Sequence, residues 1–287
     1  MKKKYLLTFV FAVSVVAVWA QARLGKGEFR AVYREYYLPA PEDTNMLEID
    51  TMYLEFSSNH SVYYSPTRRY YDSLMYEGIR RSIKSGAPFQ VPVSGQQMRA
   101  YTSTVVVHHY PNNKKLTFFT ADLWGAFWLY EEEYPLFDWQ YRQESKKIGN
   151  YTCQKAVATF RGRQWEVWYT TDIPTPFGPW KFYGLPGLVV YAEDSLRHFR
   201  FELIGFERLP AGYEMVTHYD PSEPRNFVKI SRERYLKERE LFVQDPFGYQ
   251  VRAMSGNPNA SVEIKGADKK EIGKKVIKVV SNPIELE

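Results

Sequence analysis

The stretch that decides the fold covers residues 148–194 and reads IGNYTCQKAVATFRGRQWEVWYTTDIPTPFGPWKFYGLPGLVVYAED. Two segments with period-two alternation, 151–160 and 164–170, enclose the turn Arg161-Gly162-Arg163, and this pattern predicts a β-hairpin. A loop rich in Pro and Gly follows, and the motif Gly184-Leu185-Pro186-Gly187-Leu188 then leads into a third strand. The stretch therefore predicts neighbouring antiparallel strands joined by one long, shaped loop.

The same alternation recurs on both sides of this stretch. Three further pairs of alternating segments flank short turn sequences, and they are 47–56 with 61–64, 101–110 with 115–120, and 187–192 with 197–206. Repeated neighbouring hairpins predict a mainly β fold, either a single large twisted antiparallel sheet or a half-barrel. Segments 70–85 and 231–243 carry helix signals, so we expect two or three helices packed on the sheet.

The N-terminus predicts export. Residues 1–22 combine a cationic start, Lys2-Lys3-Lys4, with a short apolar run and small residues before the possible cleavage points Ala20 and Ala22. This combination is typical of a secretory signal peptide. The alternative is a membrane anchor, which needs about 20 apolar residues, and the apolar run here is shorter. We therefore expect the signal to be removed, and residues 23–287 to form a single β-rich domain without a membrane span. Its tail, 252–287, is expected to be irregular apart from a possible edge strand at 275–280.

Charge and cysteine content narrow the class of protein. The formal net charge is +5, and removal of the three lysines of the signal leaves +2. Nucleic-acid binding usually needs a concentrated basic face, so we expect no nucleic-acid partner. Cys153 is the sole cysteine, so no internal disulfide can form. Stability must come from a buried core, and aromatic residues at 17% of the chain suit a broad β surface.

The loop and motif before residue 189 supply the candidate binding site. Gly184 and Gly187 allow positive φ or a close backbone approach, and Pro186 sets a turn position, so these three are predicted to be structural. The candidate binding residues are the apolar side chains of the same segment, namely Phe177, Trp180, Phe182, Leu185 and Leu188. They predict either a rim that shapes a site for an apolar ligand or partner, or a crossover that ties the loop to the sheet.

Residues Gly184 to Val189 resemble the motif for which the GLPGLI family is named, with Val189 where the family usually has Ile. The resemblance is strongest from Tyr151 to Ser195. It implies an exported protein of a kind typical of Bacteroidota, from a family whose activity is uncharacterised, located in the periplasm, at the outer membrane or outside the cell. No catalytic residues are known for the family, so the resemblance implies none. The hairpins also resemble the half-barrel of periplasmic lipoprotein carriers, an analogy of fold that carries no function.

Candidate catalytic groups are few. Asp172, Glu193 and Asp194 border the motif, and two carboxylates at a suitable separation could hydrolyse a glycoside. Turn chemistry is the alternative role for these loop acids. Cys153 lies inside a strand without the basic partner that activates a thiol, which predicts a buried small apolar group rather than a nucleophile.

The five histidines, which are His60, His108, His109, His198 and His218, show no zinc-site spacing. We therefore expect no metal, and since no phosphate loop or dinucleotide motif occurs, no cofactor. The sequence favours a non-enzymatic binding or accessory protein of the cell envelope, with an apolar ligand or a protein partner. The alternative is a glycan or peptide hydrolase that uses the loop carboxylates.

Overall fold

The computed structural model describes residues 23–42, 45, 47–86, 105–120, 128–216, 228–255 and 282–286. The predicted signal peptide, His218, the possible strand at 275–280 and most of the predicted irregular tail lie outside these residues. Among the described residues, no helix is long and apolar enough to cross a membrane.

The described residues are mainly β. The strands are β1 (Arg23–Lys26), β2 (Phe29–Tyr37), β3 (Glu48–Phe56), β4 (Ser61–Tyr64), β5 (Val105–Tyr110), β6 (Lys115–Thr120), β7 (Trp128–Glu133), β8 (Gln140–Ile148), β9 (Tyr151–Phe160), β10 (Arg163–Thr170), β11 (Leu188–Asp194), β12 (Phe199–Arg208), β13 (Glu214–Val216) and β14 (Val228–Lys229). The helices are α1 (Pro66–Ser85), α3 (Arg232–Gln244) and α4 (Pro246–Ser255), with a 3-10 turn at Pro111–Asn113.

Twelve of these strands form one sheet in the order β14-β7-β6-β5-β4-β3-β2-β12-β11-β10-β9-β8. The order consists of two antiparallel meanders, β2 to β7 and β8 to β12, which are joined where β12 pairs with β2. Only the short β14 pairs in parallel among these strands, with β7. The predicted mainly β fold with a large antiparallel sheet is confirmed.

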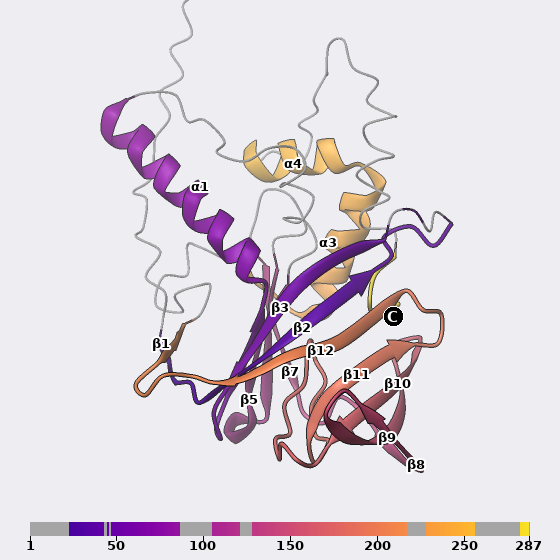
Figure 1. Ribbon diagram of the computed structural model, residues 1–287. Helices are drawn as coiled ribbons and strands as arrows, with labels where there is room; N and C mark the ends of the chain where they lie inside the picture. The colour runs from indigo at the N-terminus through magenta and orange to yellow at the C-terminus, as the bar shows by residue number, and fades with distance from the viewer. Residues whose placement is uncertain are drawn as a thin grey trace, which may run out of the picture.

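The chain connection from β7 to β8 shows that the sheet is strongly curled. Ten strand-to-strand steps separate these two strands in the sheet order, which in a flat sheet is about 48 Å at about 4.8 Å per step. The connection between Glu133 and Gln140 spans at most about 25 Å even when fully extended. The sheet must therefore curl into an open half-barrel, and Figure 1 shows β8 to β11 curling below β2, β3 and β12.

The inner face of the half-barrel is filled by the chain itself. The main core cluster combines inward side chains of nine strands with the β7–β8 crossover, the loop before β11, and helices α3 and α4. Phe137 of the crossover packs against Phe160 and Phe182 at ring-centroid distances of 4.3 and 5.3 Å. Such aromatic packing excludes water from the centre of the molecule. It also stabilises the fold by more than the buried apolar area alone would.

Part of the outer face is covered by a second, small sheet. Strands β1 and β13 pair with each other and cover a separate apolar cluster that includes Val62, Phe119 and Met215. Glu55, fully buried beside this cluster, accepts hydrogen bonds from Arg30 and from the hydroxyls of Tyr64 and Tyr213.

Helix boundaries follow capping chemistry. Ser65 caps α1 by accepting from the backbone N–H of Arg68, and Pro66 occupies the first turn, where its missing N–H costs nothing. The helix thus begins four residues before the predicted start at 70. Ser231 caps α3 by accepting from the backbone N–H of Arg234. Helix α4 was not predicted, and it begins at Pro246, because the fixed φ of proline suits the first position of a helix.

The four predicted hairpins correspond to paired strands. Pairing of β9 with β10, β3 with β4, β5 with β6 and β11 with β12 confirms each of them in the described residues. In the hairpin of the deciding stretch, Phe160 lies opposite Arg163, and Arg161 and Gly162 both have positive φ, at 46° and 76°. A two-residue turn of this kind matches the twist of the flanking strands.

Candidate functional site

All five candidate binding residues lie inside the molecule. Phe177, Trp180, Phe182, Leu185 and Leu188 are at most 3% exposed and belong to the main core cluster. Trp165 packs edge-on against Phe182 at a centroid distance of 5.0 Å. Their burial supports the crossover role of the loop over the rim role, while ligand binding by these residues stays a prediction.

The three residues predicted to be structural have distinct roles. Gly184 has φ +96°, a conformation that L side chains rarely adopt. Gly187 lies against the end of β10, where a Cβ would be 1.9 Å from the carbonyl oxygen of Thr170. Pro186, between them, is exposed. The motif thus brings the loop into direct contact with β10 immediately before β11 begins.

The same loop carries a charged residue that the sequence analysis did not identify. Lys181 is 0% exposed, and its Nζ lies 4.6 Å from the ring centre of Phe118 and 5.1 Å from that of Tyr130. The Nζ also donates a hydrogen bond of 3.2 Å to the Tyr130 hydroxyl. The only hint in the sequence is its position between Trp180 and Phe182, within a run that is otherwise apolar.

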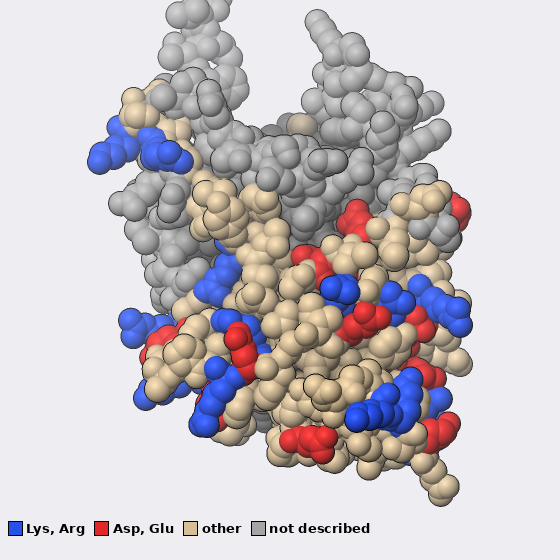
Figure 2. Space-filling view, viewed as in Figure 1, with Lys and Arg blue, Asp and Glu red and all other residues tan. Residues whose placement is uncertain are grey.

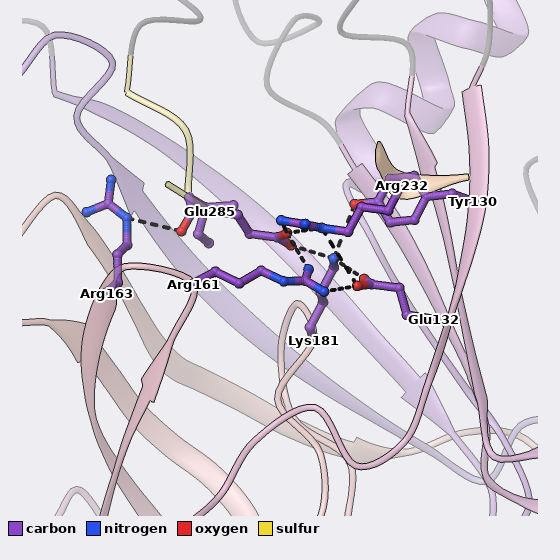
Figure 3. A network of polar contacts seen from close by, with 8 residues as sticks. Tyr130, Glu132, Arg161, Arg163, Lys181, Arg232 and Glu285 are labelled. Carbon is purple, nitrogen blue, oxygen red and sulfur yellow. Dashed lines mark hydrogen bonds and ion pairs between the residues drawn. The ribbon is translucent and has the colours of Figure 1, made fainter. Parts of the chain in front are cut away.

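Two carboxylates neutralise Lys181. Its ammonium group forms ion pairs with Glu132 of β7 and with Glu285 of the segment Asn282–Leu286. Arg161, from the turn between β9 and β10, bridges the same two carboxylates. Arg232 at the start of α3 donates to Glu285 through Nε at 3.0 Å and Nη2 at 2.8 Å. These side chains come from five separate parts of the chain, and Figure 3 shows them converging.

The electrostatics of the network follow from its burial. Burial raises the pKa of Glu285, but the charges of Lys181, Arg161 and Arg232 outweigh it and lower that pKa to about 2. The pKa of Arg161 is raised, because the hydrogen bonds and charges of the two carboxylates outweigh the effect of burial. Removal of one partner from such a network leaves an uncompensated buried charge, which is strongly destabilising. The network therefore ties the loop, β7, the β9–β10 turn and α3 together.

The three predicted hydrolase carboxylates do not converge. Asp194 is buried, pairs with Arg163 at 2.6 Å, and accepts from the backbone N–H groups of His198 and Phe199, which is the turn role that the sequence allowed. Glu193 is the preceding residue of β11, so its side chain lies on the opposite face of the sheet from that of Asp194. Asp172 is exposed beyond the other end of β10. It lies roughly 20 Å from Glu193 along the strand direction.

Cys153 is fully buried on the outer face of β9 against Trp168 and Val190. Burial raises the pKa of its thiol, which opposes formation of the reactive thiolate. Its placement agrees with the predicted role as a small apolar group. Among the described residues, no group of His, Cys, Asp and Glu side chains has the arrangement of a metal site.

An open groove of about 600 Å³ lies on the outer face of β8 to β11. The residues that line it are Gln140, Arg142, Val157, Ala158, Thr159, Gln164, Trp165, Glu166, Glu193, Asp194, Ser195 and Arg197. Burial raises the pKa of Glu166, but hydrogen bonds from Lys155 and Trp168 outweigh it, so the net shift is downward. Glu166 therefore stays ionised at neutral pH. The groove therefore contains charged and amide groups that can donate hydrogen bonds and others that can accept them.

Strand β8 forms one side of this groove and is an edge of the sheet. In the described part of the chain it pairs with β9 alone, and all its residues except Ile148 are exposed. An edge strand presents a row of backbone N–H and C=O groups that can pair with another chain. Charged side chains such as Arg142, Glu144 and Lys146 occupy much of β8.

The surface charge agrees with the near-neutral balance of the chain after residue 22. On the face shown in Figure 2, basic and acidic side chains lie interspersed over the described residues. The described part of this face therefore shows no concentrated basic area of the kind that nucleic-acid binding usually needs.

Comparison with protein-family models finds no match, and comparison with curated proteins finds none either. Among solved structures, two crystal forms of a protein named PNGF-II are similar, with TM-scores of 0.46 and 0.45 and sequence identities of 15% and 14%. The alignments cover 74% of this chain and 33% and 32% of that protein, so this chain spans about one third of it. A likeness at this level carries no argument about function, and membership of the GLPGLI family stays a prediction.

Proposed function

We propose that the chain is an exported binding or accessory protein of the cell envelope, and that it binds a protein partner at the outer groove and along β8. The observation that carries the proposal is that the groove lies directly beside an edge strand. A partner segment that pairs with β8 gains main-chain hydrogen bonds, while its side chains reach the groove, which is a recurrent mode of peptide recognition.

The chemistry of the groove favours a polar partner. Arg142, Gln164 and Arg197 supply donors, and Glu166 and Glu193 supply acceptors. The charges along β8 restrict which strand can pair with it, because like charges directly opposite each other are destabilising. We therefore expect the partner strand to carry charges complementary to those of β8.

An apolar ligand, which the sequence also allowed, is the less favoured occupant. The inner face of the half-barrel is packed with Phe137, Phe177, Phe182 and Leu185 of the chain's own loops. Binding of an apolar molecule there would first require these side chains to leave the core, at a cost of several kcal/mol.

Site-specific photocrosslinking tests the proposal. Gln164 in the groove is replaced by p-benzoylphenylalanine in the full chain, expressed in its native bacterium, and Leu241, exposed on α3, serves as the matched control position. We expect a discrete protein adduct after irradiation from position 164 and none from position 241. Equal adducts from both positions, or none from either, would contradict the groove as a binding surface.

Two mass measurements test the remaining parts of the proposal. Intact mass of the protein recovered from the periplasm or medium should show cleavage after Ala20 or Ala22. Full-length chain retained in the inner membrane would overturn export. Mass spectrometry of the purified protein should show no stoichiometric lipid, and finding one would restore the apolar ligand.

A hydrolase is the second candidate, because Glu166 lies directly opposite Glu193 in the pairing of β10 with β11. Opposite residues have Cβ atoms about 5 Å apart, a spacing compatible with two cooperating carboxyl groups. Since Glu166 stays ionised, Glu193 would have to act as the acid. Release of reducing sugar from envelope glycans by the wild type, lost in both Glu166→Gln and Glu193→Gln, would support this candidate. No release by the wild type excludes it for those glycans.

A further inference from the structure

The segment Asn282–Leu286 is bound to the rest of the protein as a separate peptide would be. The Arg163 guanidinium donates to the carbonyl of Ile284 at 3.0 Å, to the carbonyl of Pro283 at 2.7 Å and to Asn282 Oδ1 at 2.7 Å. The Asn282 side chain donates in turn to the carbonyl of Leu38. The backbone of the segment is thus bound by the side chain of Arg163, which is itself only 1% exposed.

A built pocket receives the glutamate of this segment. Glu285 enters between Lys181, Arg161 and Arg232, of which Lys181 is fully buried. The next residue, Leu286, is held by its backbone N–H, which donates to the carbonyl of Arg161 at 3.0 Å. Its side chain lies over Gly162, where an added Cβ would be 2.8 Å from the Leu286 Cβ.

The charges show that the pocket requires an anion. Lys181 and Arg161 each pair with Glu132 and with Glu285. Without Glu285, these two cations would share the single carboxylate of Glu132 among the described residues, and an incompletely neutralised charge in a largely buried site is costly in a low dielectric. Guanidinium and ammonium donors at these positions match the geometry of a carboxylate.

We propose that Arg161, Arg163, Lys181 and Arg232 form a receptor for an acidic peptide, and that Asn282–Leu286 occupies it in cis. The receptor recognises three features of the peptide. Its backbone carbonyls accept hydrogen bonds from Arg163, its glutamate fills the cationic pocket, and its apolar residue packs on Gly162. The same segment supplied by a separate molecule binds the receptor when the cis segment is weakened. The receptor does not use the outer groove, so either proposal can fail without the other.

A peptide-binding experiment on the full chain tests the receptor. The variant Asn282→Ala/Glu285→Ala removes the two side chains that hold the cis segment most specifically. We expect its thermal midpoint to fall and to be raised again by acetyl-Asn-Pro-Ile-Glu-Leu-amide in a saturable manner. The same peptide with Gln in place of Glu should bind at least tenfold more weakly by calorimetry. Equal binding of the two peptides, or no binding of either, overturns the proposal.

A second measurement avoids dependence on the folding of the double variant. The cis segment competes at an effective concentration set by its tether, and Asn282→Ala alone should lower its occupancy while leaving Glu285 in place. In fluorescence polarisation, we expect the labelled Glu peptide to bind Asn282→Ala at least fivefold more tightly than wild type. Asn150→Ala, in the exposed turn between β8 and β9, is the matched control and should equal wild type. Identical affinities for Asn282→Ala and wild type contradict the receptor.

Discussion

Gly187 lies so close to Thr170 that a Cβ atom at position 187 would be 1.9 Å from the carbonyl oxygen of Thr170 and 2.6 Å from its carbonyl carbon. Both atoms belong to the backbone and cannot move aside as a flexible side chain could. The contact holds the start of β11 against the end of β10, where Leu188 pairs with Thr170. It therefore explains in physical terms why the motif contains glycine here.

Gly187→Ala should lower the free energy of unfolding by about 3 kcal/mol or more, since relief of the clash requires the backbone of β10 or β11 to shift. Gly212→Ala is the matched control. Gly212 also lies in a turn, with φ +80° and open space around its Cα, so that change should cost about 1 kcal/mol of backbone strain. Urea denaturation measures both, and equal losses would argue against the close contact.

Leu185→Asp should lower the melting temperature sharply, because Leu185 is 2% exposed and an unpaired carboxylate in the core is costly. Pro186→Asp, at the exposed neighbouring position, should change stability by less than about 1 kcal/mol. Differential scanning fluorimetry distinguishes the two variants. An unchanged melting temperature for Leu185→Asp would return the loop to the role of a binding rim.

Lys181→Met should destabilise the fold by about 3–5 kcal/mol, the usual effect of breaking a buried ion pair from one side. Lys229 provides a surface counterpart, since its Nζ lies 3.0 Å from Glu131 with both side chains accessible to water. Lys229→Met should therefore cost no more than about 1 kcal/mol. Chemical denaturation of both variants tests the network, and comparable losses would mean that the Lys181 pairs contribute no more than surface pairs do.

Glu35 should make the protein less stable as pH rises from about 4.5 to 7. Burial raises the pKa of Glu35 from 4.5 to about 7, assisted by the charge of Asp50 opposite it and opposed by the hydrogen bond from Tyr63. Between these two pH values the folded state binds more protons than the unfolded state, so stability falls with rising pH, by about 3 kcal/mol for this group. Below pH 4.5, Glu35 is protonated in both the folded and the unfolded state, and the full stabilising contribution of its raised pKa is present.

The Glu35→Gln variant separates this effect from other titrations. Its stability should exceed that of wild type by an amount that grows from pH 4.5 to 7 and then stays constant. Urea denaturation at several pH values gives the difference. A difference that is independent of pH would contradict the raised pKa.

Cys153 should react slowly with iodoacetamide in the native protein, because its thiol is buried and its pKa is raised. Labelling should become fast in urea. Cys153→Ser should keep partner binding and lose about 1–2 kcal/mol of stability through its buried hydroxyl. Rapid native labelling together with loss of function in the serine variant would revive the nucleophile.

Several features could be predicted from the sequence because they depend on local chemistry. The turn Arg161-Gly162 and the alternation on either side of it specify a hairpin without help from distant residues. Ser231 likewise caps α3 through a hydrogen bond to the residue three positions later. Strands β7 and β8 escaped prediction because Glu131-Glu132-Glu133 and the exposed run of β8 hide the period-two pattern.

By itself, the sequence determined a mainly β chain of hairpins, a loop shaped by Gly184, Pro186 and Gly187, and a thiol without a disulfide partner. Tertiary structure alone decided that the loop fills the inner face, because a six-residue crossover can join β7 to β8 only if the sheet curls around it. It also decided the fate of the charges. Lys181, Glu132 and Glu285 are ordinary surface residue types in the sequence, and they become a buried network because segments separated by up to 153 positions meet in space.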